Sequence, residues 1–163
     1  MDLSTTYLGM TLPHPLVAGA GPLADDLDDV KRLEDAGAAA IVLRSLFEEQ
    51  ITREQMSEHI NLDRHGESFA EAASYFPSPH AFALGPFQYL DHVRRAKEAV
   101  RIPVMASLNG ATPGGWIEYA RLMAQAGADA LELNLYRLST DPETTSADIE
   151  RQAIETVREV KKV

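Results

Sequence analysis

The sequence contains no cysteine. Disulfides, thiolate chemistry and zinc sites built on cysteine are therefore excluded. No apolar run approaches the roughly 20 residues of a membrane span. The N-terminal "MDLSTTYLGM" also lacks the basic stretch and apolar core of a signal peptide. We expect a cytoplasmic protein without a membrane partner.

Basic residues are also scarce. The chain has 15 Lys and Arg against 25 Asp and Glu, and its formal net charge is −10. Because a phosphate backbone is bound by a basic surface, this balance argues against a nucleic-acid partner. Most of the negative charge is typical of a solvated helical surface.

Several catalytic motifs are missing as well. The sequence has neither GxGxxG nor GxxxxGK[ST], and its five histidines show no HxH or HExxH spacing, so no metal site is expected. The four lysines all fall on expected helices or on the C-terminal tail. No lysine at a strand end is left to form a Schiff base, which argues against an aldolase mechanism.

The composition that is present suits one soluble domain. The 163 residues are 45% hydrophobic and 25% charged, and a domain over residues 1–163 would bury roughly 70% of its unfolded surface. Four apolar segments predict β-strands, and three of them lack polar alternation, as in parallel strands covered on both faces. These segments are residues 15–19, 39–43, 103–107 and 129–135.

Helical patterns separate these segments. Leu27, Val30 and Leu33 recur every three residues, and Gly37 follows as a C-terminal stop. After the third expected strand, Pro113 can open a helix with an apolar side of Ile117, Ala120 and Met123, and Gly127 lies beyond its end. We therefore expect two helices that end at equivalent glycines.

Two further helices and one long connection complete the chain. One helix precedes the third expected strand, and the last one opens with Thr145 and Asp148 as a capping box. Residues 44–86 are expected to hold a short helix around 48–58 and an ordered Pro-rich loop. The apolar positions of the two helices are Tyr89, Leu90, Val93, Ala96 and Val100, then Ile149, Ala153, Val157 and Val160.

An internal repeat relates the two halves of the sequence. "HPLVAGAG" at 14–21 resembles "IPVMASLNG" at 102–110, and "EDAGAAAIVLRS" at 34–45 resembles "AQAGADALELNL" at 124–135. Four βα units in two such repeats predict an α/β fold of TIM-barrel type, as half of a (β/α)₈ barrel, whose complete form needs about 250 residues. An open flavodoxin-like sheet is the alternative.

Chemistry in such folds gathers at the carboxyl ends of the strands. Small residues at the first strand end allow close approach of a flat ligand, although a simple turn explains them equally well. At the second strand end, Arg44 could meet an anionic or electron-rich ligand. The candidate binding residues are Gly19, Ala20, Gly21, Arg44, Ser45, Asn109 and Asn134.

The segment "DALELNL" carries two polar residues on alternate positions of an expected strand. The repeat aligns Arg44 with Asn134, so Asn134 is expected to face the site, with Glu132 one layer deeper and within reach of Arg44. Glu132 would then orient or neutralise Arg44. A buried Glu–Arg pair that serves no ligand is the alternative.

Four strand ends in a fixed order carry a family resemblance. "PHPLVAGAG", "GAAAIVLRS", "IPVMASLNG" and above all "ELNL" together resemble the N-terminal half of the dihydroorotate dehydrogenase family, over almost the whole chain. The resemblance implies an FMN-dependent (β/α)₈ barrel that oxidises dihydroorotate to orotate in pyrimidine synthesis. Its ligands would be a flavin and a small organic acid.

The resemblance also implies roles for single residues. Residues 19–21 would supply backbone contacts to the flavin. Arg44 stands where the family usually has a lysine at the flavin, and Ser45 follows it as the family's serine does. Asn134, the asparagine of "ELN", would touch both flavin and substrate.

The loop after the fourth expected strand departs from the family. There the family continues "ELN" with a Ser-Cys-Pro-Asn stretch or a variant of it, and the loop bears the catalytic base, Cys in one class and Ser in the other. This chain has Tyr136, Arg137, Leu138 and Ser139 instead. An arginine, with a pKa above about 12, is no base at neutral pH. Ser139 and Thr140 are the candidates that are left for the base.

A half barrel would have two open sheet edges and an exposed apolar face, which invite pairing with another chain. We therefore expect self-association or a complementary half barrel, in a protein of roughly twice this length. The leading function is a flavin oxidoreductase with half of its site in this chain. The alternatives are a non-catalytic half-barrel fragment, assembly module or engineered scaffold, and a different barrel enzyme acting on a phosphorylated metabolite.

Overall fold

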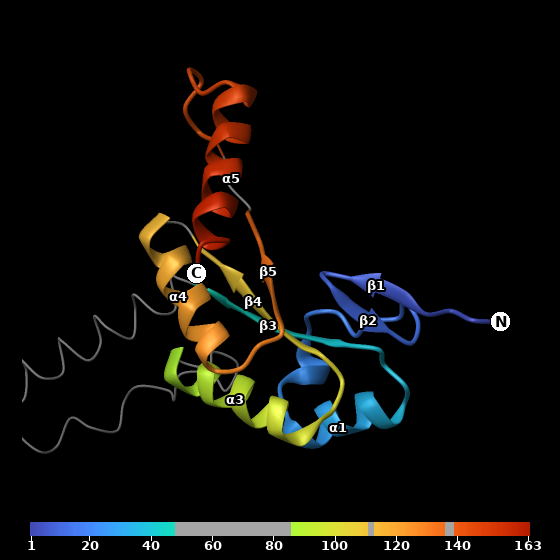
Figure 1. Ribbon diagram of the computed structural model, residues 1–163. Helices are drawn as coiled ribbons and strands as arrows, with labels where there is room; N and C mark the ends of the chain where they lie inside the picture. Colours follow the sequence, from blue (N-terminus) through green and yellow to red (C-terminus); the bar gives the residue numbers. More distant parts are fainter. Residues whose placement is uncertain (48–85, 111–112, 136–138) are drawn as a thin grey trace, which may run out of the picture.

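The computed structural model describes residues 1–47, 86–110, 113–135 and 139–163, and Figure 1 shows their arrangement. The short helix expected around residues 48–58 and the Pro-rich loop after it lie outside the described residues. The elements in chain order are β1 (Thr5–Tyr7), β2 (Met10–Leu12), the 3₁₀ turn η1 (Pro22–Ala24), α1 (Leu27–Asp35), β3 (Ile41–Phe47), α3 (Pro86–Ala99), β4 (Val104–Asn109), α4 (Pro113–Gln125), β5 (Ala130–Leu133) and α5 (Ser146–Val160).

The expected parallel sheet is confirmed. Its strand order is β3-β4-β5, and both pairs are parallel. The segment expected as the first strand, residues 15–19, contributes one parallel bridge, from Ala18 to Ile41. Pro15 has no backbone N–H to donate and Gly19 packs no side chain, which explains why pairing is so short there.

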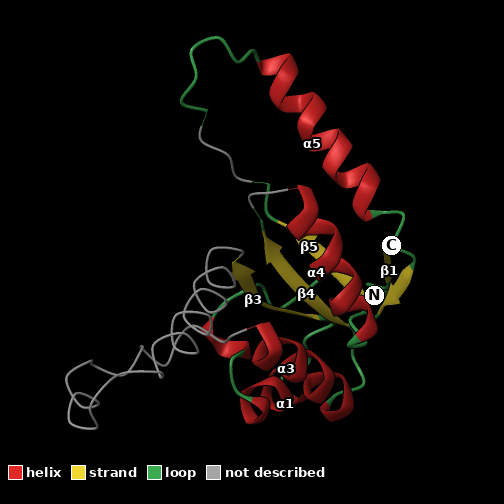
Figure 2. Ribbon diagram, turned by 90° about the vertical axis from the view of Figure 1, so that its left-hand side faces the viewer, coloured by secondary structure: helices red, strands yellow, loops and turns green. Residues whose placement is uncertain are grey.

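The two faces of this sheet are covered differently. On one face, which we call the helical face, Ile41, Val104 and Ala106 pack with residues of α1, α3 and α4 into the larger core cluster. On the other, the hairpin face, Val42 and Met105 pack with Leu12 of β2. Figure 2 shows α1 and α3 side by side along the same side of the sheet, and the two helices are in contact.

The strand register shifts once within β3. Val42 pairs with Met105, but the next pair is Ser45 with Ser107, so β3 spends three residues where β4 spends two. An extra residue of this kind is typical of a β-bulge, and it changes which side chains beyond it face each side of the sheet. The shift therefore puts Ser45, and not Arg44, in line with Ser107.

The internal repeat is confirmed at the level of single hydrogen bonds. Gly37 and Gly127 both have positive φ, at 89° and 98°. Around each glycine the same three backbone bonds close the helix, in positions that differ by 90 residues. Glycine is favoured here because a left-handed conformation ends many helices. The bonds run from Ala36 N, Gly37 N and Ala38 N to Arg32 O, Glu34 O and Leu33 O, and from Ala126 N, Gly127 N and Ala128 N to Leu122 O, Ala124 O and Met123 O.

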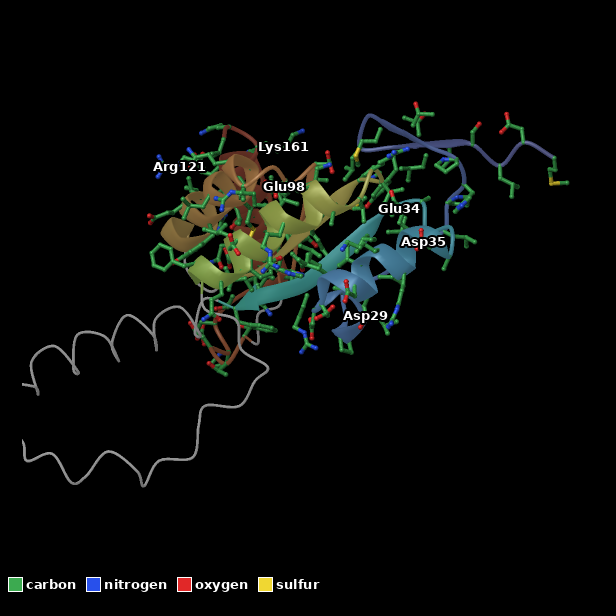
Figure 3. All side chains as sticks on the ribbon, turned by 90° about the horizontal axis from the view of Figure 1, so that it is seen from below. Asp29, Glu34, Asp35, Glu98, Arg121 and Lys161 are labelled. Atoms are coloured by element: carbon green, nitrogen blue, oxygen red, sulfur yellow. The ribbon has the colours of Figure 1, made fainter. Side chains whose placement is uncertain are left out.

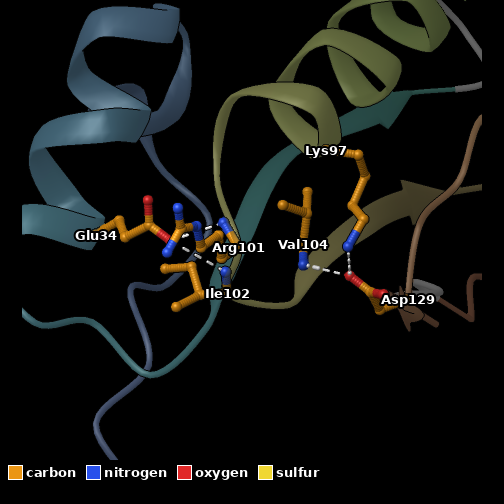
Figure 4. A network of polar contacts seen from close by, with 6 residues as sticks. All are labelled: Glu34, Lys97, Arg101, Ile102, Val104 and Asp129. Atoms are coloured by element: carbon orange, nitrogen blue, oxygen red, sulfur yellow. Dashed lines mark hydrogen bonds and ion pairs between the residues drawn. The ribbon is translucent and has the colours of Figure 1, made fainter.

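Two carboxylates fix the chain on either side of the start of β4 (Figure 4). Glu34 Oε1 accepts from the backbone N–H groups of Arg101, at 2.7 Å, and Ile102, at 3.1 Å. Asp129 Oδ2 accepts from Val104 N, at 2.7 Å, and forms an ion pair with Lys97 at 2.6 Å. These bonds tie the loop before β4 to the end of α1 and to the loop before β5.

The antiparallel hairpin β1–β2 was not anticipated from the sequence. Leu8 and Gly9 have φ of 50° and 80°, the left-handed pair that a two-residue hairpin turn requires. Leu12 of this hairpin is 1% exposed. The usable signal was Gly9 between two short runs that contain threonine and aromatic or aliphatic residues.

The last helix is confirmed as α5, together with its capping box. Thr145 and Asp148 form the reciprocal capping box before α5. No residue of α5 is buried, and Ile149 and Val157 of the expected apolar stripe are each 37% exposed. Figure 1 shows α5 extending past the end of the sheet. Ile154 on the same helix is 51% exposed.

Charged side chains cover the outer surface of the helices. Figure 3 labels Asp29 on α1, Glu98 on α3 and Arg121 on α4 among them. Within the described ranges, none of the helices is both long and apolar enough to cross a membrane.

Candidate functional site

Four polar residues meet on the hairpin face of the sheet, towards the carboxyl ends of its strands. Ser45, Ser107 and Glu132 lie in one row across β3, β4 and β5, because the register pairs Ser45 with Ser107 and Ser107 with Glu132. Asn134 follows two residues after Glu132, on the same face. We call these four residues the inward polar cluster.

Hydrogen bonds connect all four members. Ser45 Oγ and Ser107 Oγ are 2.7 Å apart, and Ser107 Oγ donates to Glu132 Oε1 at 2.7 Å. Asn134 Nδ2 lies 3.0 Å from both serine oxygens and 3.5 Å from Glu132 Oε1. Ser107 is fully buried and the other three are half-buried. The cluster is thus a connected polar network at the edge of an apolar core.

Tyr89 of α3 supports the cluster from the helical face. Its hydroxyl donates to Ser107 O at 3.2 Å and accepts from Ser107 N at 2.9 Å. Burial raises the pKa of Tyr89, and the charge of Glu132 acts in the same direction, whereas the hydrogen bond with the Ser107 backbone acts against them. The phenol therefore stays protonated and holds the strand on which Ser107 sits.

Arg44 does not pair with Glu132, and this expectation was wrong. Its guanidinium binds Asp25 through two bonds, Nε to Oδ1 at 2.8 Å and Nη2 to Oδ2 at 2.5 Å. The alternative of a buried Glu–Arg pair is excluded for the same reason. The physical cause is the register shift after Val42, because the extra residue turns Ser45 toward the hairpin face and leaves Arg44 beside the segment before α1.

The two strand ends expected after residues 43 and 107 also lie further along the chain. β3 continues to Phe47 and β4 to Asn109, so Arg44 and Ser45 are inside a strand rather than in a loop. Asn109 pairs with Phe47 and is half-buried. By strand alternation it shares the face of Ser107.

Residues 19–21 leave the sheet at the same edge, directly after the bridge at Ala18. Gly19 and Ala20 are exposed, and a Cβ placed on Gly19 would meet no atom within 4 Å. The backbone here is open to a ligand. Ser139 and Thr140, the candidates for a base, are exposed and follow β5 at a distance of several residues, and the structure assigns them no contact with the cluster.

Three residues that support this arrangement were not proposed from the sequence. Ser107 is a single hydroxyl within the buried run of β4, which was a usable signal. Asp25 is one of many acidic residues before α1, and Tyr89 fits an apolar helical stripe equally well. The sequence around Asp25 and around Tyr89 therefore does not predict their contacts with Arg44 and Ser107.

A separate surface cavity of about 690 Å³ lies between the N-terminal parts of α1 and α3. Its lining includes Asp25, which pairs with Arg44, and His92, whose Nε2 lies 2.7 Å from Ala24 O. It lies on the helical side, away from the inward polar cluster. In the described ranges no group of three or more His, Asp or Glu is placed to hold a metal ion.

Comparison with known proteins gives a consistent set of relatives, although no protein-family model matches the chain. The catalytic subunit of dihydroorotate dehydrogenase B (NAD(+)) from Methanocella arvoryzae is 31% identical over 152 residues, which cover 88% of this chain and 46% of that protein. The Methanosarcina mazei subunit of the same name is 31% identical over 134 residues, with 82% and 40% covered.

A third relative has a different but related name. The NAD-dependent dihydropyrimidine dehydrogenase subunit PreA of Escherichia coli is 28% identical over 137 residues, which cover 82% of this chain and 32% of that protein. The chain thus spans less than half the length of the curated relatives it matches. These similarities confirm the resemblance carried by the strand ends, and the chain is a dihydroorotate dehydrogenase-like protein.

Proposed function

We propose that this chain contributes half of the flavin site of an FMN-dependent oxidoreductase of the dihydroorotate dehydrogenase type. The observation that carries the proposal is the inward polar cluster. It joins Ser45, Ser107, Glu132 and Asn134 at the carboxyl edge of a parallel sheet, where ligands bind in open and closed α/β folds. The names of the relatives support an oxidoreductase.

The residues present fit a flavin at this edge. Residues 19–21 offer an exposed backbone with open space at Gly19, which a flat ring could approach closely. Ser45, Asn109 and Asn134 would bind polar edges of the ring. Bound FMN supplies hydride acceptance, which the side chains of the protein lack.

The chain's own residues would position the substrate and remove a proton from it. Asn134 would bind the substrate beside the ring. Ser139 or Thr140 would take the proton, provided that the loop after β5 brings one of them to the site. Arg44 would supply positive charge near the ligand only to the extent that Asp25 leaves it available.

The proposal includes a partner for the open side of the sheet. Within the described residues β5 pairs on one side only, with β4, and α5 presents apolar residues to solvent. A second half barrel, as a further part of the same protein or as a second copy, would cover both. The complete assembly would then be a (β/α)₈ barrel.

Titration with FMN tests the proposal. We expect the purified chain, alone or with a complementary half barrel, to bind FMN. The bound cofactor would be followed by its own absorbance band at about 450 nm. Asn134→Ala should weaken binding, whereas Glu98→Ala, at an exposed position of α3, should not. Dihydroorotate oxidation by the FMN-loaded assembly would identify the substrate.

Two results would contradict the proposal. If neither the chain nor its assembly binds FMN, the flavin oxidoreductase is ruled out, and the non-catalytic half barrel and a different barrel enzyme are the functions left. If FMN affinity is unchanged in Asn134→Ala, the inward polar cluster is not part of the flavin site.

A further inference from the structure

We propose that Glu132 is a positioning residue that fixes the side-chain amide of Asn134 with its carbonyl oxygen toward the strand end. The site would therefore select a ligand group that donates a hydrogen bond. The second part of this inference rests on the proposed function, because it takes Asn134 to be in the ligand site. The first part rests on the hydrogen-bond geometry alone.

The direction of each hydrogen bond in the cluster follows from Glu132. Ser107 has one hydroxyl proton, and it is donated to Glu132 Oε1 at 2.7 Å. The contact of 2.7 Å between Ser45 Oγ and Ser107 Oγ then has Ser45 as its donor. Both hydroxyl protons are thereby used, and each serine oxygen has acceptor capacity left.

The Asn134 amide must match this arrangement. Two serine oxygens at 3.0 Å need a donor, and the Nδ2 group of Asn134 has two N–H bonds to offer. The opposite orientation would place Oδ1 against two oxygens without a free proton and near the Glu132 carboxylate, which lies 3.5 Å from the amide position. A partly buried contact between two oxygen atoms with no hydrogen between them is costly. The orientation with Nδ2 toward the serine oxygens is therefore strongly favoured.

The orientation has a consequence for recognition. The oxygen and the nitrogen of a primary amide are bonded to the same planar carbon and point in different directions, so fixing the nitrogen also fixes the oxygen. With the nitrogen held by the serines, Asn134 presents a hydrogen-bond acceptor away from the cluster, at the end of β5. A ring N–H is the matching group, and either the flavin or a heterocyclic substrate could supply it.

Side-chain amide exchange measures the positioning role directly, with no ligand present. The Asn134 side-chain signals in ¹⁵N–¹H NMR spectra would be assigned by their loss in Asn134→Asp. We expect their exchange with water to be faster by about tenfold in Glu132→Met, which keeps volume but removes the acceptor. Glu132→Gln should restore slow exchange, because its carbonyl can accept the Ser107 proton.

Controls separate positioning from general damage. Glu98→Ala removes an exposed carboxylate from α3 and should leave the Asn134 exchange rate unchanged. Circular dichroism would verify that each variant is folded, and Glu132→Ala replaces the Met variant if that one is not. Equal exchange rates in the wild type and in the variant without an acceptor would overturn the inference.

Methylated ligands identify the donor. If the flavin donates, FMN methylated at its ring N3–H should bind about tenfold more weakly than FMN. If the substrate donates, FMN-loaded protein should discriminate to the same extent between orotate and an N-methylated orotate. Unchanged affinity for all methylated probes would overturn the selection of a donor. A protein that binds no FMN would refute the proposed function, while the exchange rates would still decide the role of Glu132.

Discussion

The hydroxyl oxygen of Tyr89 lies 2.9 Å from the backbone nitrogen of Ser107 and 3.2 Å from its backbone oxygen. Both residues are buried, at 3% and 0% exposure. Ser107 is the first residue of β4 that is paired after the register shift in β3, where a sheet ladder is locally disrupted. One phenol thus binds both polar groups of the peptide backbone at the residue on which the inward polar cluster is centred.

Removing this hydroxyl should destabilise the fold. Tyr89→Phe keeps the ring but leaves a buried N–H and a buried C=O without this partner, which costs about 1–3 kcal/mol. Urea unfolding followed by circular dichroism measures the loss. Tyr7→Phe is the matched control, because Tyr7 is 50% exposed. Equal midpoints for the two variants would show that water replaces the Tyr89 hydroxyl at no cost.

Alkaline pH should destabilise the protein through ionisation of Tyr89. Burial raises the pKa of Tyr89 in the folded protein above the unfolded value of roughly 10. Its contribution to stability is therefore complete below about pH 10 and is lost as pH rises further, because the unfolded chain then binds fewer protons. The free energy of unfolding should fall more steeply above about pH 10 in the wild type than in Tyr89→Phe. Parallel curves for the two proteins would contradict this prediction.

The Arg44–Asp25 pair should contribute to stability only modestly. The two side chains are 34% and 31% exposed, so solvent screens them, although two bonds hold the guanidinium. A double-mutant cycle with Arg44→Met and Asp25→Asn should give a coupling energy of about 1 kcal/mol. The exposed pair Arg94–Asp91 on α3 is the comparison, with an expected coupling below that value. A coupling near zero for both pairs would leave Arg44 free for a ligand.

Alanine substitutions at two glycines should have different effects, one on the stability of the fold and the other on FMN binding. Gly37 has a φ of 89°, so Gly37→Ala is strained and should destabilise the protein by about 1 kcal/mol or more. Gly19→Ala meets no atom within 4 Å and should leave stability almost unchanged. It should nevertheless weaken FMN binding, because the new methyl group occupies the approach to the backbone. Unaltered FMN affinity in Gly19→Ala would remove this segment from the site.

The exposed apolar side of α5 should promote association. Ile154 is 51% exposed and Val157 is 37% exposed on this helix. We expect light scattering to detect self-association that Ile154→Gln reduces, since the change removes apolar surface without adding charge. Glu155→Gln, at the neighbouring exposed position, should have no such effect. A wild-type chain that stays monomeric at all concentrations would contradict the prediction.

The sequence correctly predicted helix ends and caps, which depend on residues close together in the chain. The stops at Gly37 and Gly127 and the capping box of Thr145 with Asp148 depend on contacts between residues close in sequence. The apolar stripe Leu27, Val30 and Leu33 likewise predicted a helix that the structure contains. Such features are readable because hydrogen bonding within one turn and one residue's φ determine them.

The candidate site needed the tertiary structure as well. The sequence by itself determined that polar residues, among them Ser45 and Asn134, stand near the strand ends, and that the strands run parallel. Whether Arg44 or Ser45 faces Ser107 depended on one extra residue in β3, because side chains alternate along a strand and a slip of one position exchanges the two faces. That pairing joins residues 62 positions apart in the chain, so packing between the strands decided it rather than any local pattern.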